Sequence, residues 1–395
     1  MTHLERFKAI CRGQQVDYVP IIGLPGASGV AFGGAWGQVY LRLIDTGMPK
    51  SIKGWSAETG WDADAAQSWS EFWGTLTPLT IDAFPSDPPK GVRFNKKVQG
   101  QYEILEYETG AVTRQLIDND NMYSMPEFIK YHVTDRQSWN FYKELNTPGD
   151  IWPGEKIEEF CRKFENRDRP LFIRLGSTWG QIRDLSGTER ACMMLYDEPE
   201  LAKDMIDFQS ELRRKYFYPL IERLRPEIIQ LSEDCCYKNG MILSPDHFKQ
   251  FCSPVYNELS DLAKSCCVEM FAVDTDGHIA DLIPVLEECG VNATYPVESK
   301  ADNDLLQLRK QHPDFIFLGW IEKEVINEGN EHLIEKEIMT KVTPMLESGR
   351  YFPNIDHSLQ PFCTFNNLRS FMELLHKVTS NPEGNFYSVT ERNQG

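Results

Sequence analysis

The sequence predicts an α/β protein, a (β/α)8 TIM barrel that carries N-terminal insertions and a small antiparallel meander. Seven largely apolar runs end in polar or charged residues or in glycine, and most are separated by helical stretches. A strand that is buried on both faces is expected to be continuously apolar, and strands that alternate with helices predict parallel βαβ units. The chain has 395 residues, enough for a barrel of roughly 250 residues with insertions. The runs are Val19–Ile22, Pro170–Leu175, Glu227–Leu231, Val268–Val273, Val291–Val297, Phe315–Trp320 and Tyr351–Ile355.

The N-terminal part of the chain has a less regular pattern. Leu4–Gly13 predicts a short amphipathic helix, and residues 23–80, rich in Gly, Trp and Ser, are interpreted as rim loops and short helices. Val92–Leu116 contains three strand-like runs that are separated by Gly100 and Gly110, which is typical of an antiparallel meander. Because no linker divides the chain, we expect one domain over residues 1–395, with rim insertions at about 23–150.

The remaining helices follow the alternation of the barrel. Ile157–Phe164 predicts a helix before the strand at Pro170, and Glu189–Leu224 predicts one or two helices. Ser244 is expected to begin a helix that continues to Lys264, because Ser-Pro-Asp is a start signal.

Composition excludes several classes of partner. The formal net charge of −18 argues against nucleic-acid binding, which needs a concentration of Lys and Arg. No apolar stretch is long enough to predict a membrane span, and the N-terminus lacks an apolar signal core, so we expect a cytoplasmic protein. The ten cysteines include no CxxC spacing and are expected to be reduced thiols, most of them in the core.

Acids and histidines follow the strands at the end where the active site of a barrel is expected. Asp274 and Asp276 follow one strand, Glu298 follows the next, and His357 follows the last. Carboxylates and imidazole together suit a divalent metal such as Zn²⁺, so these four residues are predicted as metal ligands. The alternative for either Asp is a helix N-cap, and the alternative for His357 is a structural histidine.

Other polar and aromatic residues near strand ends are candidates for catalysis and substrate binding. Glu233 and Asp234 are predicted as an acid–base pair, and His278 as a reserve ligand or a base. Trp179 and Tyr237 are predicted to border a substrate pocket, with the glycine-rich loop Leu24–Gly34 as a cover. A solvated acidic pair and ordinary packing of the aromatic rings are the alternatives.

Short motifs spread along nearly the whole chain resemble the uroporphyrinogen decarboxylase superfamily, and this resemblance implies a (β/α)8 barrel. The motifs are Arg6–Pro20, Leu195–Leu201, Ser232–Gly240, Val273–Gly277, Tyr295–Glu298, Leu318–Ile321 and Pro353–Ser358.

The resemblance implies one of two chemistries. Decarboxylases of this superfamily carry an arginine motif after the first strand, whereas Ile21–Gly29 contains no arginine. The other branch consists of corrinoid-dependent methyltransferases that use zinc. Where its thiol-methylating members have His-x-Cys and a final Cys, this chain has Asp274-x-Asp276 and His357, and the acidic position matches Glu298.

Replacement of the thiolates by oxygen and nitrogen ligands implies a metal that is a stronger Lewis acid. The expected function is therefore methyl transfer from an aryl methyl ether to cob(I)alamin. No corrinoid-binding Asp-x-His-x-x-Gly occurs, so the cobalamin is expected on a partner corrinoid protein. A metal-free enzyme, a decarboxylase of a small acid, transfer from methanol or a methylamine, and a barrel that only binds a ligand remain open.

Overall fold

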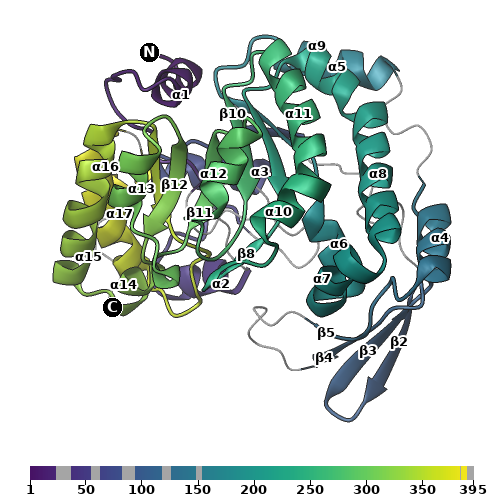
Figure 1. The fold of residues 1–395 in the computed structure, drawn as a ribbon. Helices are drawn as coiled ribbons and strands as arrows, with labels where there is room; N and C mark the ends of the chain where they lie inside the picture. The colour runs from purple at the N-terminus through teal and green to yellow at the C-terminus, as the bar shows by residue number, and fades with distance from the viewer. Residues whose placement is uncertain are drawn as a thin grey trace.

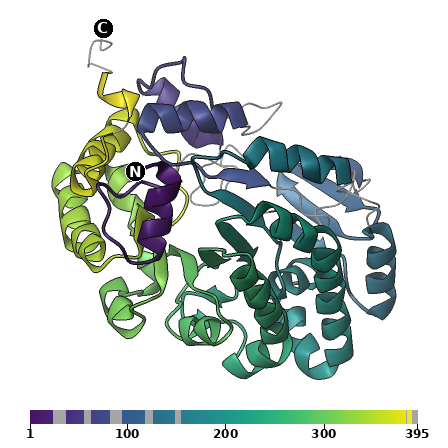
Figure 2. The ribbon, with the colours of Figure 1, turned by 90° about the horizontal axis from the view of Figure 1, so that it is seen from above.

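The computed structural model describes residues 1–23, 37–54, 63–81, 94–117, 126–147, 154–382 and 384–388. Seven parallel strands form a curled sheet in the order β1-β6-β7-β10-β11-β12-β13, and helices cover its outer side (Figures 1 and 2). The strands are β1 Leu79–Ile81, β6 Leu171–Arg174, β7 Ile228–Ser232, β10 Met270–Asp274, β11 Ala293–Val297, β12 Ile316–Ile321 and β13 Tyr351–Ile355. Six of the seven predicted apolar runs are thus confirmed as neighbouring parallel strands.

The seventh run, Val19–Ile22, lies at the seam between the two edges of the sheet. Ile22 forms an isolated parallel bridge with Leu76, just before β1. On the other side, the Asn354 side chain in β13 donates hydrogen bonds to the carbonyls of Ile22 (2.9 Å) and Gly23 (2.6 Å). Among the described residues, the parallel sheet therefore has seven strands and one bridged segment, rather than the eight full strands that the sequence predicts.

The inner face of the sheet is apolar at its N-terminal end. Phe172, Ile228 and Met270 are side by side in register and are fully buried. Helix α1 closes this end with Phe7 and Ile10, which belong to the same apolar cluster. Thr2 begins α1 with a capping box, so the predicted helix is confirmed.

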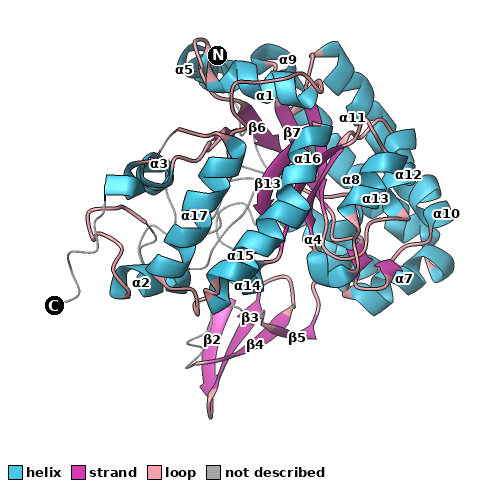
Figure 3. Cartoon of the chain, turned by 90° about the vertical axis from the view of Figure 1, so that its left-hand side faces the viewer, coloured by secondary structure: helices cyan, strands magenta, loops and turns pink. Residues whose placement is uncertain are grey.

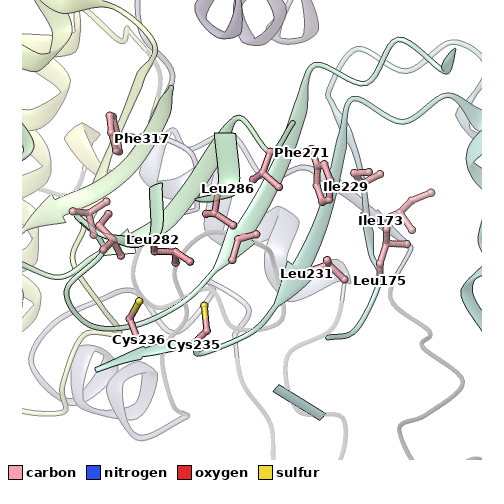
Figure 4. Packing of buried hydrophobic residues seen from close by; sticks show 14 of the residues in the cluster. Ile173, Leu175, Ile229, Leu231, Cys235, Cys236, Phe271, Leu282, Leu286 and Phe317 are labelled. Carbon is pink, nitrogen blue, oxygen red and sulfur yellow. The ribbon is translucent and has the colours of Figure 1, made fainter. Parts of the chain in front are cut away.

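The outer face packs against the helices. Neighbouring strands align Ile173, Ile229 and Phe271 on this face. These side chains belong to the larger of the two buried apolar clusters, to which α12 contributes Leu282 and Leu286 (Figure 4). Strands buried on both faces explain why the runs in the sequence are continuously apolar.

Seventeen α-helices are present among the described residues, and they follow the predicted alternation with the strands. They are α1 His3–Cys11, α2 Gly37–Asp45, α3 Ala63–Trp73, α4 Arg136–Leu145, α5 Gly154–Phe164, α6 Trp179–Ser186, α7 Thr188–Asp197, α8 Pro199–Tyr216, α9 Tyr218–Leu224, α10 Pro245–His247, α11 Ser253–Ser265, α12 Leu282–Glu288, α13 Leu305–Gln311, α14 Lys323–Glu328, α15 Glu331–Glu337, α16 Thr343–Ser348 and α17 Phe365–Thr379. None is long and apolar enough to cross a membrane within the described part of the chain.

The predicted helix from Ser244 to Lys264 starts where expected but is not uniform. The Ser244 hydroxyl accepts a hydrogen bond from the His247 amide, as an N-cap does. Between α10 and α11, Phe248–Cys252 forms a π-helical turn that supplies Phe248 and Cys252 to the core.

The antiparallel meander is confirmed, and it projects from the body of the molecule (Figures 1 and 3). It has four strands in sequential order: β2 Phe94–Gln99, β3 Tyr102–Tyr107, β4 Val112–Leu116 and β5 Glu127–Lys130. The sequence predicted the first three. β5 is short, and three of its four residues are exposed, so no apolar pattern marks it.

Candidate functional site

Polar side chains occupy the inner face of the sheet above the apolar layer. Arg174 in β6 is in register with Gln230 in β7, and Ser232, Asp274 and Tyr295 are aligned one step further along β7, β10 and β11. Residues in register, or two apart on one strand, point to the same face. The inner face therefore changes from apolar to polar toward the C-terminal ends of the strands.

Asp274 is surrounded by this polar layer. Gln230 Nε2 lies 3.2 Å from Asp274 Oδ2 and donates a hydrogen bond to it. Burial raises the pKa of Asp274 to about 8, and the negative charges of Asp234 and Asp276 add to the rise, while Arg174 opposes it. Asp274 therefore holds its proton at neutral pH.

Replacement of Asp274 by Asn should stabilise the protein at about pH 8 and have little effect near pH 4. The pKa is about 8 in the folded state against an ordinary value of 3.8, so the folded state binds more protons between these limits. Stability of the wild type then falls as pH rises, by on the order of 1 kcal/mol per pH unit, and the variant lacks this loss. Urea unfolding across this range measures the difference. A gap between the two proteins that does not change with pH would contradict the raised pKa.

At the ends of the strands, Asp276 and His357 form a pair. His357 Nε2 lies 3.6 Å from Asp276 Oδ1, and both side chains are about two-fifths exposed, at 41% and 44%. Burial raises the pKa of Asp276, positive charge on His357 opposes the rise, and the charges of Asp234 and Glu298 add to it. The structure thus brings together residues that follow β10 and β13, which are far apart in the sequence.

Glu298 joins this pair through the backbone of the β10 loop. Its Oε2 accepts a hydrogen bond of 2.7 Å from the amide of Gly277. Gly277 has a φ of +86°, and a Cβ there would lie 2.6 Å from the backbone of Tyr237, so only glycine fits this turn. Glu298 therefore holds the loop that carries Asp276.

Asp356 positions the residue that follows it, His357. It is buried, and its two carboxylate oxygens accept hydrogen bonds from the amides of Ser299 (3.2 Å) and Lys323 (3.1 Å). These contacts join the ends of β11, β12 and β13.

His278 lies beside the site but is directed elsewhere. Its Nδ1 is 2.8 Å from the carbonyl oxygen of Ala301, and its amide donates to the carbonyl of Tyr237.

The alternative that Asp274 or Asp276 caps a helix is not realised, because α12 begins only at Leu282.

Glu233 lies in the interior below the rim. Its exposed fraction is 1%, and its carboxylate accepts hydrogen bonds from the amides of Thr178, Trp179 and Gly180 at the start of α6, at 2.8–2.9 Å. The hydroxyl of Tyr256 donates a fourth hydrogen bond of 2.8 Å. Glu233 thus stabilises a helix N-terminus, and both of its oxygens are occupied.

A buried arginine completes this network. Arg213 in α8 is fully buried and donates hydrogen bonds to the carbonyls of Leu175 (2.9 Å) and Ser177 in the β6–α6 loop. Burial raises the pKa of Glu233, and its hydrogen-bond donors and the charge of Arg213 oppose the rise. Glu233 and Arg213 therefore hold the loop after β6 through separate hydrogen bonds to its amides and its carbonyls.

Asp234, the next residue, reaches the surface instead. Its side chain is 44% exposed and pairs with Arg183 of α6 at 3.0 Å, and Arg183 also binds the Asp234 carbonyl. The predicted acidic pair is therefore divided between a buried position and a rim position.

The two predicted aromatic residues also differ in their positions. Tyr237, in the two-residue strand β8 (Cys236–Tyr237), is 53% exposed near the rim. Trp179 begins α6 and is buried in the core with 1% exposure, so its packing is that of a core residue. The loop Leu24–Gly34 lies outside the described residues.

The predicted metal ligands do not converge as a set. Asp276 and His357 are close, but Glu298 is bound to Gly277 and Asp274 lies deeper, against Gln230. Within the described ranges, no three His, Cys, Asp or Glu side chains lie close enough together to hold a metal ion. The arrangement does not fit a zinc site, and zinc stays a prediction that the metal content of the purified protein tests.

Sequence reasoning did not single out Arg174, Gln230 or Arg183. Arg174 and Gln230 each interrupt an apolar run, and this was the signal that could have identified them. Such side chains are costly to bury on a strand without a polar neighbour. Arg183 lies on a helix, where an arginine is unremarkable until the fold brings Asp234 next to it.

Comparisons with known proteins agree with this architecture. Residues 155–378, more than half of the chain, match the family model described as Uroporphyrinogen decarboxylase (URO-D). A solved structure of a methyltransferase from Methanosarcina mazei is similar, with a TM-score of 0.58, 14% sequence identity, and coverage of 95% of this chain and 99% of that one. At this identity the likeness shows the shared fold alone. No curated protein matches the chain.

Proposed function

Because the chain belongs to the uroporphyrinogen decarboxylase family, we propose that it is a methyltransferase of that family that moves a methyl group from an aryl methyl ether to cob(I)alamin. The corrinoid is supplied by a partner protein. The observation that carries the proposal is the Asp276–His357 pair at the strand ends, above a polar inner layer. The methyltransferase that shares the fold supports the same class of reaction.

The chemistry asks for an acid beside the ether oxygen. As the corrinoid attacks the methyl carbon, the carbon–oxygen bond breaks and its electron pair stays on the oxygen. A proton donor there stabilises the transition state more than the ground state, since the oxygen becomes negative only as the bond breaks. The Asp276–His357 pair can deliver that proton, and the product is a phenol.

In this proposal Asp276 and His357, rather than the predicted Glu233, supply the acid. Both oxygens of Glu233 already accept hydrogen bonds inside the protein, whereas Asp276 and His357 are partly exposed. Asp234, also exposed, adds negative charge that raises the pKa of Asp276 and so favours its protonated form. No step here requires a metal.

A decarboxylase of a small acid is the second candidate. Arg174, a cation on the inner face of the sheet, favours it together with the family. The family's arginine motif is missing from Ile21–Gly29, so this candidate would depend on a different arginine.

An assay of the corrinoid spectrum tests the proposal. Cob(I)alamin mixed with the protein and a methoxyaromatic should convert to methylcobalamin, and omission of either should prevent it. Carbon dioxide released from a small carboxylic acid, with no methylcobalamin from any methyl donor, would favour the decarboxylase.

A further inference from the structure

Arg174 places a positive charge deep on the inner face of the sheet. Its guanidinium carbon lies 6.0 Å from the ring centroid of Phe172, two residues earlier on β6, so it rests directly above the apolar layer. The positive charge of Arg174 acts on Asp274 and opposes the rise of the pKa of Asp274. The cation is thus below the rim carboxylates, at the bottom of the polar layer.

Gln230, the register neighbour of Arg174, has an unused acceptor. It is fully buried, and its Nε2 donates to Ser232 Oγ (3.0 Å) and to Asp274 Oδ2 (3.2 Å). Its Oε1 is buried and accepts no hydrogen bond from the described residues. A buried acceptor without a donor is costly, so such an atom indicates a place for a ligand's O–H or N–H.

We propose that Arg174 and Gln230 form a substrate subsite for a carboxylate group, with Gln230 Oε1 accepting a hydrogen bond from a neighbouring donor on the same ligand. The proposal rests on the proposed function and names the substrate class as methoxylated aromatic carboxylic acids. One guanidinium matches one carboxylate in charge and geometry. A more highly charged anion is disfavoured by Asp234, Asp276 and Glu298, which lie toward the rim.

The order of the layers sets the direction of the ligand. The carboxylate lies deep, beside β6 and β7, and the aromatic ring extends toward the strand ends. The methoxy group then faces Asp276 and His357, which follow the polar layer along β10 and β13. A rise of about 3.3 Å per strand residue makes a benzene ring equivalent to roughly two residues of strand.

Binding of two matched probes tests the subsite without any need for methyl transfer. 4-Methoxybenzoate should bind the wild type at least about tenfold more tightly than the neutral 4-methoxybenzamide, as measured by calorimetry. Arg174→Gln should abolish this preference, and Arg174→Lys should keep part of it, because the charge remains but the bidentate geometry is lost. Arg169→Gln is the matched control, since Arg169 precedes the same strand at its opposite end and should leave the preference unchanged.

The outcomes separate the two proposals. Equal affinities of the two probes for the wild type, or an undiminished preference in Arg174→Gln, would overturn the subsite. If Arg174→Gln does not fold, the Lys variant carries the same comparison, and a preference equal to that of the wild type would overturn the bidentate pairing. Carboxylate binding that depends on Arg174, but without methyl transfer to a corrinoid, would keep the subsite and overturn the proposed function.

Discussion

Replacement of Glu233 by alanine should lower the free energy of unfolding by about 3–5 kcal/mol, because several buried hydrogen-bond donors lose their common acceptor. The change removes the acceptor for the amides of Thr178, Trp179 and Gly180 and for the Tyr256 hydroxyl. It also removes the negative charge that acts on the buried guanidinium of Arg213. A buried donor that loses its acceptor costs about 1–3 kcal/mol, and four donors lose theirs together. Urea unfolding at neutral pH measures the effect.

An exposed ion pair provides the control for Glu233. Glu158 pairs with Arg223 on the surface, where the two side chains are 49% and 55% exposed, so Glu158→Ala should cost under about 1 kcal/mol. A loss for Glu233→Ala as small as that of Glu158→Ala would show that the network does not hold the β6–α6 loop. Near-normal stability together with loss of activity would instead return Glu233 to a catalytic role.

Replacement of Asp276 by asparagine should reduce kcat by about 10²–10⁴-fold, which is the usual contribution of a general acid. Asparagine keeps the size of the side chain but cannot hold the transferable proton. The wild-type rate should fall as pH rises through the range in which the carboxyl group of Asp276, whose pKa burial raises to about 6, loses its proton. The variant should lose this pH dependence. Steady-state methyl transfer as a function of pH measures both effects.

Asp281 offers the matched substitution for Asp276. It is exposed, lies five residues further on in the same segment before α12, and its side chain makes no cap hydrogen bond. Asp281→Asn should therefore leave kcat and its pH profile unchanged. Equal activities of the wild type and Asp276→Asn would remove Asp276 from the mechanism, and a parallel loss in both variants would point to a general effect of charge at the rim.

The strands were predictable from the sequence because burial on both faces leaves a clear apolar run. The same physics explains two of the strands that were not predicted, β1 and β5. β1 has only three residues, two of them partly exposed, and β5 is almost fully exposed, so neither has a run long enough to stand out. The segment that ends at Ile22 is held by hydrogen bonds from the Asn354 side chain, and no local pattern in the sequence predicts these contacts.

The candidate site was predictable in its position but not in the roles of its residues. Parallel strands bring their C-terminal ends together, so the proximity of Asp276 and His357 followed from the fold. Whether a carboxylate reaches the rim or turns inward depends on backbone geometry that the sequence does not reveal. Asp234, with φ +42°, turns outward to Arg183, while Glu233 turns inward to α6.

Transfer of the methyl group from the ether to the corrinoid can be followed in a single turnover with a methoxyaromatic acid labelled with ¹³C in the methoxy carbon. The reaction is run in the presence of cob(I)alamin, and both products are measured by mass spectrometry. We expect labelled methylcobalamin and the corresponding phenol in equal amounts, with the carboxylate intact. Unlabelled corrinoid together with loss of the carboxylate as carbon dioxide, the methoxy group remaining on the ring, would contradict it.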